Sequence, residues 1–234
     1  ISIYNDGEGI DIAEHPTKVS KDGKPVMIPE MIFGHLLTST NYEKDEKKIV
    51  GGKNGYGAKL TNIFSIIFKI ETVDHVRKLK YTQEFKNNMK SKGKPKITKY
   101  SQKPYTKISW VADFERFGIT GYSEKMYQLI ERRLYDIAGV TDKSLNVFYN
   151  GSMIKQKSFD KYIGLYLNDE KMIYEDIHSR WSIGVALSTT DKFEQVSFVN
   201  GISTSKGGKH VDYITKQIVQ LLTTHIEKKE KTKV

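Results

Sequence analysis

Residues Gly51 to Lys59 read GGKNGYGAK, and this stretch decides how the chain is interpreted. Its four glycines let backbone N–H groups approach an anion closely. Glycine adopts backbone angles that strain other residues, and it has no side chain to block the approach. The residues that follow, Ala58 to Phe64, are typical of the first turns of a helix, whose N-terminus carries partial positive charge. The stretch therefore favours an anion-binding loop, with phosphate as the natural ligand. A purely structural glycine turn is the alternative.

The spacing of the loop excludes the common P-loop, which requires Gly, four residues and then Gly-Lys-Ser/Thr. Gly52 and Gly57 have the right separation, but Ala58 comes before Lys59. Leu60 stands where the magnesium-binding hydroxyl belongs. A phosphate site in this loop must therefore be of another type.

A second glycine cluster lies at the start of the chain. Residues 1–4 alternate apolar and polar side chains, which predicts a strand buried on one face. The strand leads into Asn5-Asp6-Gly7-Glu8-Gly9. A short polar side chain before Gly-x-Gly would present an amide to a cavity beneath a flexible turn. An ordinary hairpin turn is the alternative, because Asn, Asp and Gly are all turn formers.

Together the two clusters resemble the nucleotide-binding motifs of the ATPase superfamily shared by gyrase, Hsp90, histidine kinases and MutL. Four longer runs narrow the resemblance to eukaryotic-type (type IIA) DNA topoisomerase II: residues 29–42, 133–139, 197–202 and 207–213. The resemblance spans nearly the whole chain. It implies that the chain is the ATP-binding portion of such an enzyme.

The resemblance implies a role for each residue of the two motifs. Asn5 would contact the adenine end of ATP, and Ser39, Thr40 and Asn41 would line the ribose and phosphate side. The loop would wrap the triphosphate through Gly52, Lys53, Asn54, Gly55, Tyr56, Gly57, Ala58 and Lys59. These residue types suit their roles: an amide for a base edge, hydroxyls for a sugar, and glycines and lysine for phosphate. ATP and Mg²⁺ are the implied cofactors.

The same resemblance implies that some functional residues lie outside this sequence. The family's catalytic glutamate and magnesium-binding asparagine would precede Ile1, and its γ-phosphate lysine would follow Val234. We therefore expect negligible ATP hydrolysis by this chain alone, and a monomer or weak dimer, although the full-length enzyme is a homodimer.

The family implies an α/β fold: a two-layer sandwich of a mixed β-sheet backed by helices, of the Bergerat type, over residues 1–172. Residues 173–234 would begin a transducer domain of the ribosomal protein S5 type.

Local patterns predict further elements. Ser123 caps a helix that Gly139 ends, and a strand over 145–149 leads into an Asn150-Gly151 turn. Strands follow over 181–187 and 195–199, and the last predicted element is a helix whose apolar stripe runs from Val211 to Leu222 and is partly exposed.

Charge is the main compositional signal. Lys and Arg number 38 against 28 Asp and Glu, giving a net charge of +10, which favours polyanionic partners without specifying one. The resemblance implies that Lys228, Lys229 and Lys231 face double-stranded DNA; a solvated helix end is the alternative. No apolar run is long enough to span a membrane, and no cysteine is present. The implied location is the nucleus, or for a viral protein the host cytoplasm or viral factory.

Two other functions remain open from the sequence. The chain could be the ATPase domain of another superfamily member, such as a chaperone or a mismatch-repair protein. It could also be a basic nucleic-acid-binding module without enzyme activity. The first leaves the topoisomerase-like runs unexplained, and the second leaves both glycine motifs unexplained.

Overall fold

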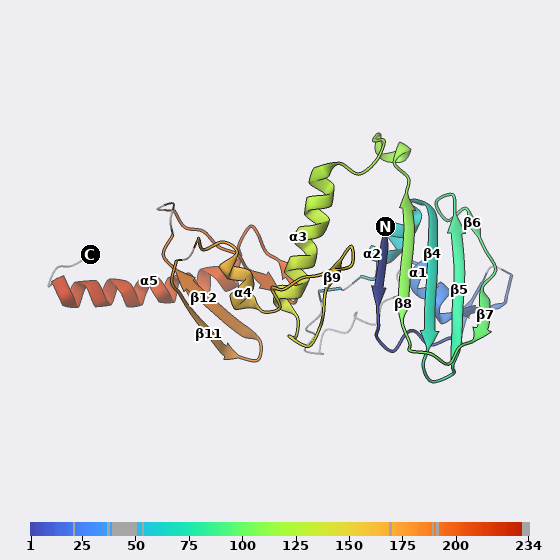
Figure 1. Cartoon of the computed structure of the whole chain (residues 1–234), viewed down its shortest axis with the longest axis horizontal. Coiled ribbons are helices and arrows are strands. Elements are labelled where there is room, and N and C mark those ends of the chain that lie inside the picture. The colour runs from blue at the N-terminus through green and yellow to red at the C-terminus, as the bar shows by residue number, and fades with distance from the viewer. Residues whose placement is uncertain are drawn as a thin grey trace. The chain divides into compact units, whose positions relative to one another are not determined.

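The computed structural model describes residues 1–20, 22–36, 38, 51–52, 54–168, 170–188, 190 and 192–230. The chain forms two compact units, one of residues 1–47 and 52–122 and the other of residues 48–51 and 123–234. Both units are drawn in Figure 1. The functional boundary expected between residues 172 and 173 stays a prediction.

The first unit is a β-sheet with helices on one face. Its elements are β1 (Ser2–Asn5), β2 (Glu14–Val19), β3 (Pro25–Met27), α1 (Ile28–Gly34), α2 (Gly57–Ile63), β4 (Ser65–Asp74), β5 (Leu79–Lys86), β6 (Ser91–Lys92), β7 (Lys96–Lys99), β8 (Thr106–Ala112) and the 3-10 turn η1 (Glu115–Phe117). The strand order is β1-β8-β4-β5-β6, with β7 paired to β5 and with β2 and β3 forming a separate hairpin. Figure 1 shows α1 and α2 behind the strands of the large sheet.

This arrangement confirms the α/β class and the two-layer architecture. The sheet differs from the predicted mixed sheet, because every strand pairing within the described residues is antiparallel. The connection from β4 to β5 is short, and a short connection permits only antiparallel neighbours.

The core of the first unit lies between the sheet and α1. Alternate residues of β4 and β5 point to this face, as the two-residue period of a strand requires. Phe68, Ile70, Tyr81 and Phe85 are fully buried there, and Phe33 of α1 packs against them. The open face of the same strands carries lysines and glutamates, among which Lys69 and Lys80 form ion pairs with Glu71.

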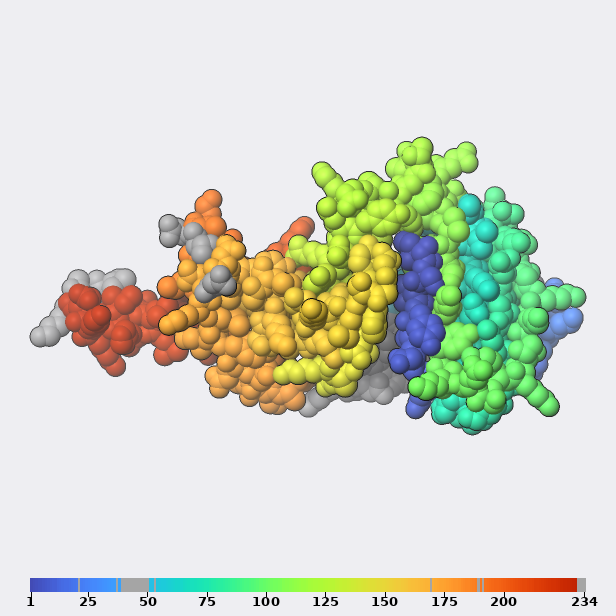
Figure 2. Space-filling model, viewed as in Figure 1, coloured from blue at the N-terminus to red at the C-terminus, as the bar shows by residue number. Residues whose placement is uncertain are grey.

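The strand predicted at the start of the chain is confirmed as β1, but it is not buried on one face. All four of its residues are exposed, because β1 lies at the edge of the sheet and pairs there with β8. In the space-filling view of Figure 2 this dark-blue strand is visible at the surface.

Within the described residues, the second unit contains three helices and three two-stranded hairpins. Its elements are α3 (Glu124–Val140), β9 (Phe148–Tyr149), β10 (Ser152–Met153), α4 (Phe159–Gly164), β11 (Met172–His178), β12 (Trp181–Ala186), β13 (Phe198–Val199), β14 (Ile202–Ser203) and α5 (Lys209–Glu230). The predicted turn between β9 and β10 is confirmed: Asn150 and Gly151 both have positive φ, of 48° and 84°. The strands predicted over 145–149 and 195–199 are shorter than expected.

The two ends of α3 test the capping predictions. The Ser123 cap is confirmed, since the Ser123 hydroxyl accepts a hydrogen bond from the Met126 amide at 3.4 Å. The prediction that Gly139 ends the helix is wrong, because the helix continues to Val140. Gly139 instead faces α4: a Cβ at this position would lie 2.7 Å from Cβ of Tyr162. The glycine allows the two helices to approach closely.

The last helix, α5, has no buried residue. The partial exposure predicted for its apolar stripe is confirmed, because Leu221 and Leu222 are both exposed. Within the described ranges, neither α5 nor any other helix combines the length and apolar content that a membrane span requires.

Candidate functional site

The two glycine motifs both belong to the first unit, apart from Gly51. The first motif forms the turn that follows β1. The Asn5 side-chain oxygen accepts a hydrogen bond from the Gly7 amide at 3.3 Å, which closes a small turn and fixes the orientation of the exposed Asn5 amide.

Within this turn, Gly9 cannot be replaced by another residue without strain. Its φ is +82°, a left-handed conformation that favours glycine. A Cβ at Gly9 would lie 1.7 Å from the carbonyl oxygen of Val73 in β4. The turn therefore packs its backbone directly on the backbone of the central strand.

Two side chains of β4 hold the segment after the turn, and the sequence reasoning missed both. The Thr72 hydroxyl accepts from the Ile10 amide at 3.0 Å and contacts the Thr106 hydroxyl at 2.9 Å. The Asp74 carboxylate accepts from the Ile12 amide at 2.9 Å. Thr72 and Asp74 are two residues apart and therefore share the inward face of β4, which could have indicated a common role. The strand pattern, however, predicts apolar core side chains at these positions.

Asp74 is held ionised by its surroundings. Burial raises the pKa of this carboxyl, but hydrogen bonds from the Arg77 and Ile12 amides, the Arg77 guanidinium and the Val76 amide outweigh that effect. Together they lower its pKa from 3.8 to about 2. The carboxylate is thus a charged anchor between the turn and the end of β4.

This depressed pKa predicts acid sensitivity. Because the folded value lies below the unfolded one, the stabilisation is complete above about pH 4 and is lost as the pH falls toward 2. The shift corresponds to about 2 kcal/mol. We expect the difference in unfolding free energy between the native chain and Asp74→Asn to narrow by about 1.5 kcal/mol between pH 6 and pH 2.5, because pH 2.5 still lies above the folded pKa; urea unfolding measures it. A difference that stays constant over this range would contradict the assignment.

The second motif forms the entry to α2. Gly55 has a φ of +66°, a left-handed conformation that favours glycine. Gly52 and Gly57 are different, because a Cβ at either position would meet no described atom within 4 Å. The fold of the described chain therefore gives no steric reason for these two glycines. The expected helix after the loop is confirmed as α2, although with seven residues it is short.

Lys59 is the most unusual residue of this motif, since only 3% of it is exposed. Its ammonium donates to the carbonyl oxygen of Thr38 at 3.2 Å. No carboxylate of the described residues lies within ion-pair distance of it. Burial lowers the pKa of Lys59. The lysine thus has a desolvated positive charge without a described anionic partner.

A second buried side chain of α2 fixes the helix in place. The Asn62 NH₂ group donates to the carbonyl oxygen of Phe33 in α1 at 3.1 Å. The Asn62 carbonyl oxygen is buried and has no hydrogen-bond partner among the described residues. Asn62 thereby connects α2, which carries Lys59, to α1.

Some predicted site residues lie outside the described residues: Ser39, Thr40, Asn41, Lys53 and Lys231. Asn5, Asn54, Tyr56, Ala58 and the glycines of the loop are described, and all but Gly55 are exposed. Lys228 and Lys229 lie in the last turn of α5 and are exposed. The described residues contain no group of three His, Asp or Glu side chains that could hold a metal ion.

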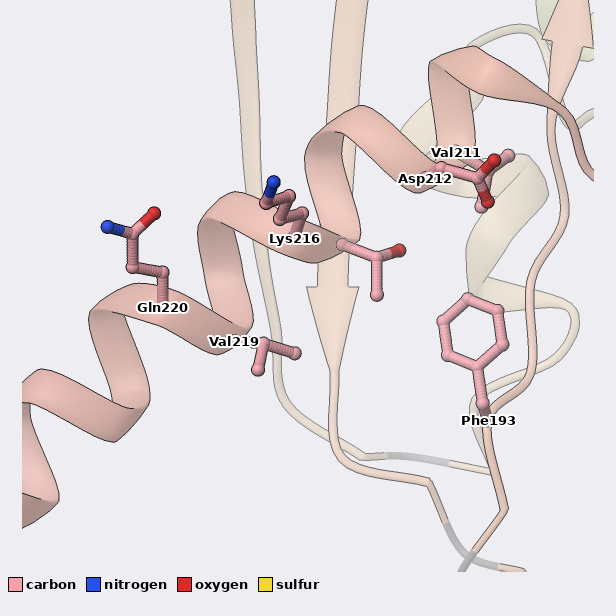
Figure 3. Close-up of a pocket in the computed structure, with 7 residues that line it drawn as sticks. Phe193, Val211, Asp212, Lys216, Val219 and Gln220 are labelled. Carbon is pink, nitrogen blue, oxygen red and sulfur yellow. The ribbon is translucent and has the colours of Figure 1, made fainter. Parts of the chain in front are cut away.

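One hollow of the described structure lies away from the predicted site. It has a volume of about 680 Å³ and is lined by α5 and Phe193. In Figure 3 the Phe193 ring lies across from Val211 and Val219, while Lys216 and Gln220 point to the other side of the helix. None of its lining residues belongs to either glycine motif.

Comparison with known proteins identifies the family. Residues 146–234 match the sequence family described as DNA gyrase B. DNA topoisomerase 2 of Acanthamoeba polyphaga mimivirus is 45% identical over 237 residues, covering 99% of this chain and 18% of the viral protein. The crystal structure of the ATPase region of Saccharomyces cerevisiae topoisomerase II matches with a TM-score of 0.87 at 45% identity, over 97% of this chain and 59% of that chain. This chain belongs to the type II DNA topoisomerase family.

Other relatives agree with this assignment. The yeast DNA topoisomerase 2 sequence is 43% identical over 254 residues, covering 100% of this topoisomerase segment and 17% of the yeast protein. The ATPase and transducer domains of DNA topoisomerase II from Balamuthia mandrillaris match with a TM-score of 0.87 at 38% identity, over 97% of this chain and 57% of that chain. These relatives favour neither a chaperone or mismatch-repair ATPase nor a non-enzymatic basic module. The segment spans less than a fifth of the length of the curated relatives it matches.

Proposed function

We propose that this chain binds ATP and forms part of the ATPase region of a type II DNA topoisomerase. The observation that carries the proposal is Lys59, a buried ammonium whose described partner is a single carbonyl oxygen. Burying a charge is costly unless it is paired. A phosphate group would supply the missing anion, and it would also explain Gly52 and Gly57, whose lack of side chains the described fold does not require.

The residues of the first unit divide the recognition of ATP between them. Asn5 offers its NH₂ group to the adenine edge, held in orientation by the bond from Gly7. The loop from Gly52 to Lys59 offers backbone amides and one ammonium to the phosphates. Ser39, Thr40, Asn41 and Lys53 complete the ribose and phosphate side in this proposal.

The activity of the whole enzyme forms the wider part of the proposal. ATP binding would favour closure of paired ATPase domains, which would pass one DNA duplex through a transient break in another. Mg²⁺ would accompany the bound ATP, although the described residues contain no group of three His, Asp or Glu side chains that could hold it alone. Lys228, Lys229 and Lys231 would contact DNA phosphates without reading sequence. A homodimer, a role in chromosome segregation and a nuclear or viral-factory location follow from the same parent enzyme.

The decisive experiment is a calorimetric titration of the chain with a non-hydrolysable ATP analogue, compared with Lys59→Met. Methionine retains most of the length of the side chain and removes the charge. We expect binding to weaken by roughly 10- to 100-fold, because a hydrogen bond to a charged group is worth about 1.5–3 kcal/mol.

Lys99→Met provides the matched control, since Lys99 is an exposed lysine of β7 in the same unit. This variant should bind the analogue as the native chain does. Equal binding by the Lys59→Met variant and the native chain would show that Lys59 does not face the phosphates, and the phosphate assignment of the loop would then fail.

A further inference from the structure

A second hollow lies wholly in the second unit, at the start of α4. It has a volume of about 280 Å³ and is lined by Lys143, Lys157, Ser158, Asp160 and Lys161. It shares no residue with the nucleotide motifs or with the lysines at the end of α5. Figure 2 shows the yellow part of the chain, which contains these residues, at the surface.

Positive charge dominates this hollow. Three of its five lining residues are lysines, and Asp160 is the single carboxylate among them. None of the three ammoniums is within ion-pair distance of a carboxylate in the described ranges. The nearby Asp142 carboxylate already accepts two hydrogen bonds from Ser144. Lys143 and Lys157 also attract the Asp142 carboxylate, but at more than ion-pair distance. Three neighbouring lysines without a close carboxylate partner attract further anions.

The hollow is also partly preorganised. Lys157 is half-buried, and its ammonium donates to the Asn146 side-chain oxygen at 2.7 Å. That bond holds the ammonium at the wall of the hollow and leaves two of its three protons for a ligand. A donor fixed before binding loses less conformational entropy when the ligand arrives.

Ser158 is the second, independent indication of a ligand. It is only 8% exposed and it lines the hollow. It stands at the N-cap of α4, but its hydroxyl makes no capping bond and has no hydrogen-bond partner among the described residues. The hydroxyl oxygen is not among the buried unpaired atoms of the described residues, so it is accessible from the hollow and offers a donor beside three lysines.

We propose that this hollow binds a phosphate group, held by Lys143, Lys157 and Lys161 and by the Ser158 hydroxyl. Its volume is at the lower limit of small-ligand sites, which suits a single tetrahedral anion better than a whole nucleotide. The phosphate can be carried by the DNA backbone or by a small molecule. The site is separate from the proposed nucleotide site, so either one can fail without the other.

Two probes test the site on the whole 234-residue chain. The first is inorganic phosphate at millimolar concentration, followed by NMR of the backbone amides from Ser158 to Lys161. We expect saturable shifts of these signals, and we expect Ser158→Ala to weaken the binding about threefold.

The second probe is a short duplex DNA, titrated by fluorescence anisotropy at several salt concentrations. The variant Lys143→Gln/Lys157→Gln/Lys161→Gln should bind it at least tenfold more weakly. Its slope of log affinity against log salt should fall by about 1 for the one phosphate lost. The control Lys94→Gln/Lys96→Gln/Lys99→Gln removes the same charge from exposed positions of the first unit and should bind within threefold of the native chain.

The outcomes separate the two sources of phosphate. Amide shifts together with selective loss of duplex binding support a phosphate of the DNA backbone. Amide shifts with equal duplex binding by both triple variants support the same site with a small phosphate-bearing ligand. Absence of saturable amide shifts in a folded native chain overturns the proposal.

Discussion

Replacing Gly9 by alanine is expected to destabilise the chain by about 3 kcal/mol or more. The left-handed conformation alone costs a non-glycine residue roughly 1–2 kcal/mol. A Cβ would also lie 1.7 Å from the Val73 carbonyl oxygen, which belongs to the backbone of the central strand. Relief of that clash requires the turn to move away from β4, at a further cost of about 1–3 kcal/mol. Urea unfolding at neutral pH measures the sum.

Gly118 provides the matched control. It has a similar φ of +64°, but a Cβ there would meet no atom of the described residues within 4 Å. Gly118→Ala should therefore cost only the conformational part, about 1–2 kcal/mol. The difference between the two variants isolates the close approach of the turn to β4. If Gly9→Ala were no more destabilising than Gly118→Ala, the turn would not be packed on the strand as the structure has it.

The same variant bears on the proposed function. The Gly9 turn positions Asn5 through the bond from Gly7, so a displaced turn should also weaken binding of an ATP analogue. Gly118→Ala, in a turn outside both glycine motifs, should leave that binding unchanged. Gly9→Ala is thus expected to lower both stability and affinity for the ATP analogue, whereas Gly118→Ala is expected to lower stability alone.

Local signals predicted a large part of this fold. The Ser123 cap, the Asn150-Gly151 turn, the helix after the glycine loop and the strand over 181–187 all depend on a few neighbouring residues, and the structure confirms each of them. The family resemblance supplied the rest of the architecture. Residue type and spacing are sufficient where the interactions that select a conformation lie within one turn or one strand.

Contacts between distant segments could not be read in this way. Gly139 fits the pattern of a helix end, and only its contact with Tyr162 shows that close helix packing is its role. The loop sequence predicts that Lys59 is available to an anion, but not that it is buried and bonded to Thr38. Thr72 and Asp74 lie 62 residues from the amides that they bind. Such roles depend on which strands and helices become neighbours in the fold, and the periodicity of side chains along one segment does not specify its neighbours.

Gln83 illustrates a polar residue placed where the strand pattern predicts an apolar one. It lies on the inward face of β5 between Tyr81 and Phe85 and is almost fully buried. Its NH₂ group donates to the Glu30 carboxylate at 2.8 Å and to the Gly93 carbonyl oxygen at 3.0 Å. Its oxygen accepts from the Tyr81 hydroxyl at 2.6 Å. Glu30 belongs to α1 and also pairs with Lys92 at 2.6 Å.

Gln83→Leu is expected to cost about 3 kcal/mol of stability, although leucine fits the apolar pattern better. The substitution leaves a buried carboxylate oxygen and a buried phenol hydroxyl without partners, and each unsatisfied group costs about 1–3 kcal/mol. Urea unfolding measures the loss, with Thr82→Val on the opposite face of the same strand as a control expected within about 0.5 kcal/mol. A stabilised Gln83→Leu variant would contradict the network.

A double-mutant cycle then shows whether Glu30 is the partner that matters. In a Glu30→Met background the buried carboxylate is gone, so Gln83→Leu should cost at least about 1 kcal/mol less than in the native chain. The network holds α1 on the sheet, and Asn62 connects α1 to α2 and therefore to Lys59. Gln83 interrupts the apolar pattern of β5, but through Glu30 and α1 it is expected to support α2, the helix that carries Lys59. Binding of the ATP analogue should fall in Gln83→Leu and remain unchanged in Thr82→Val.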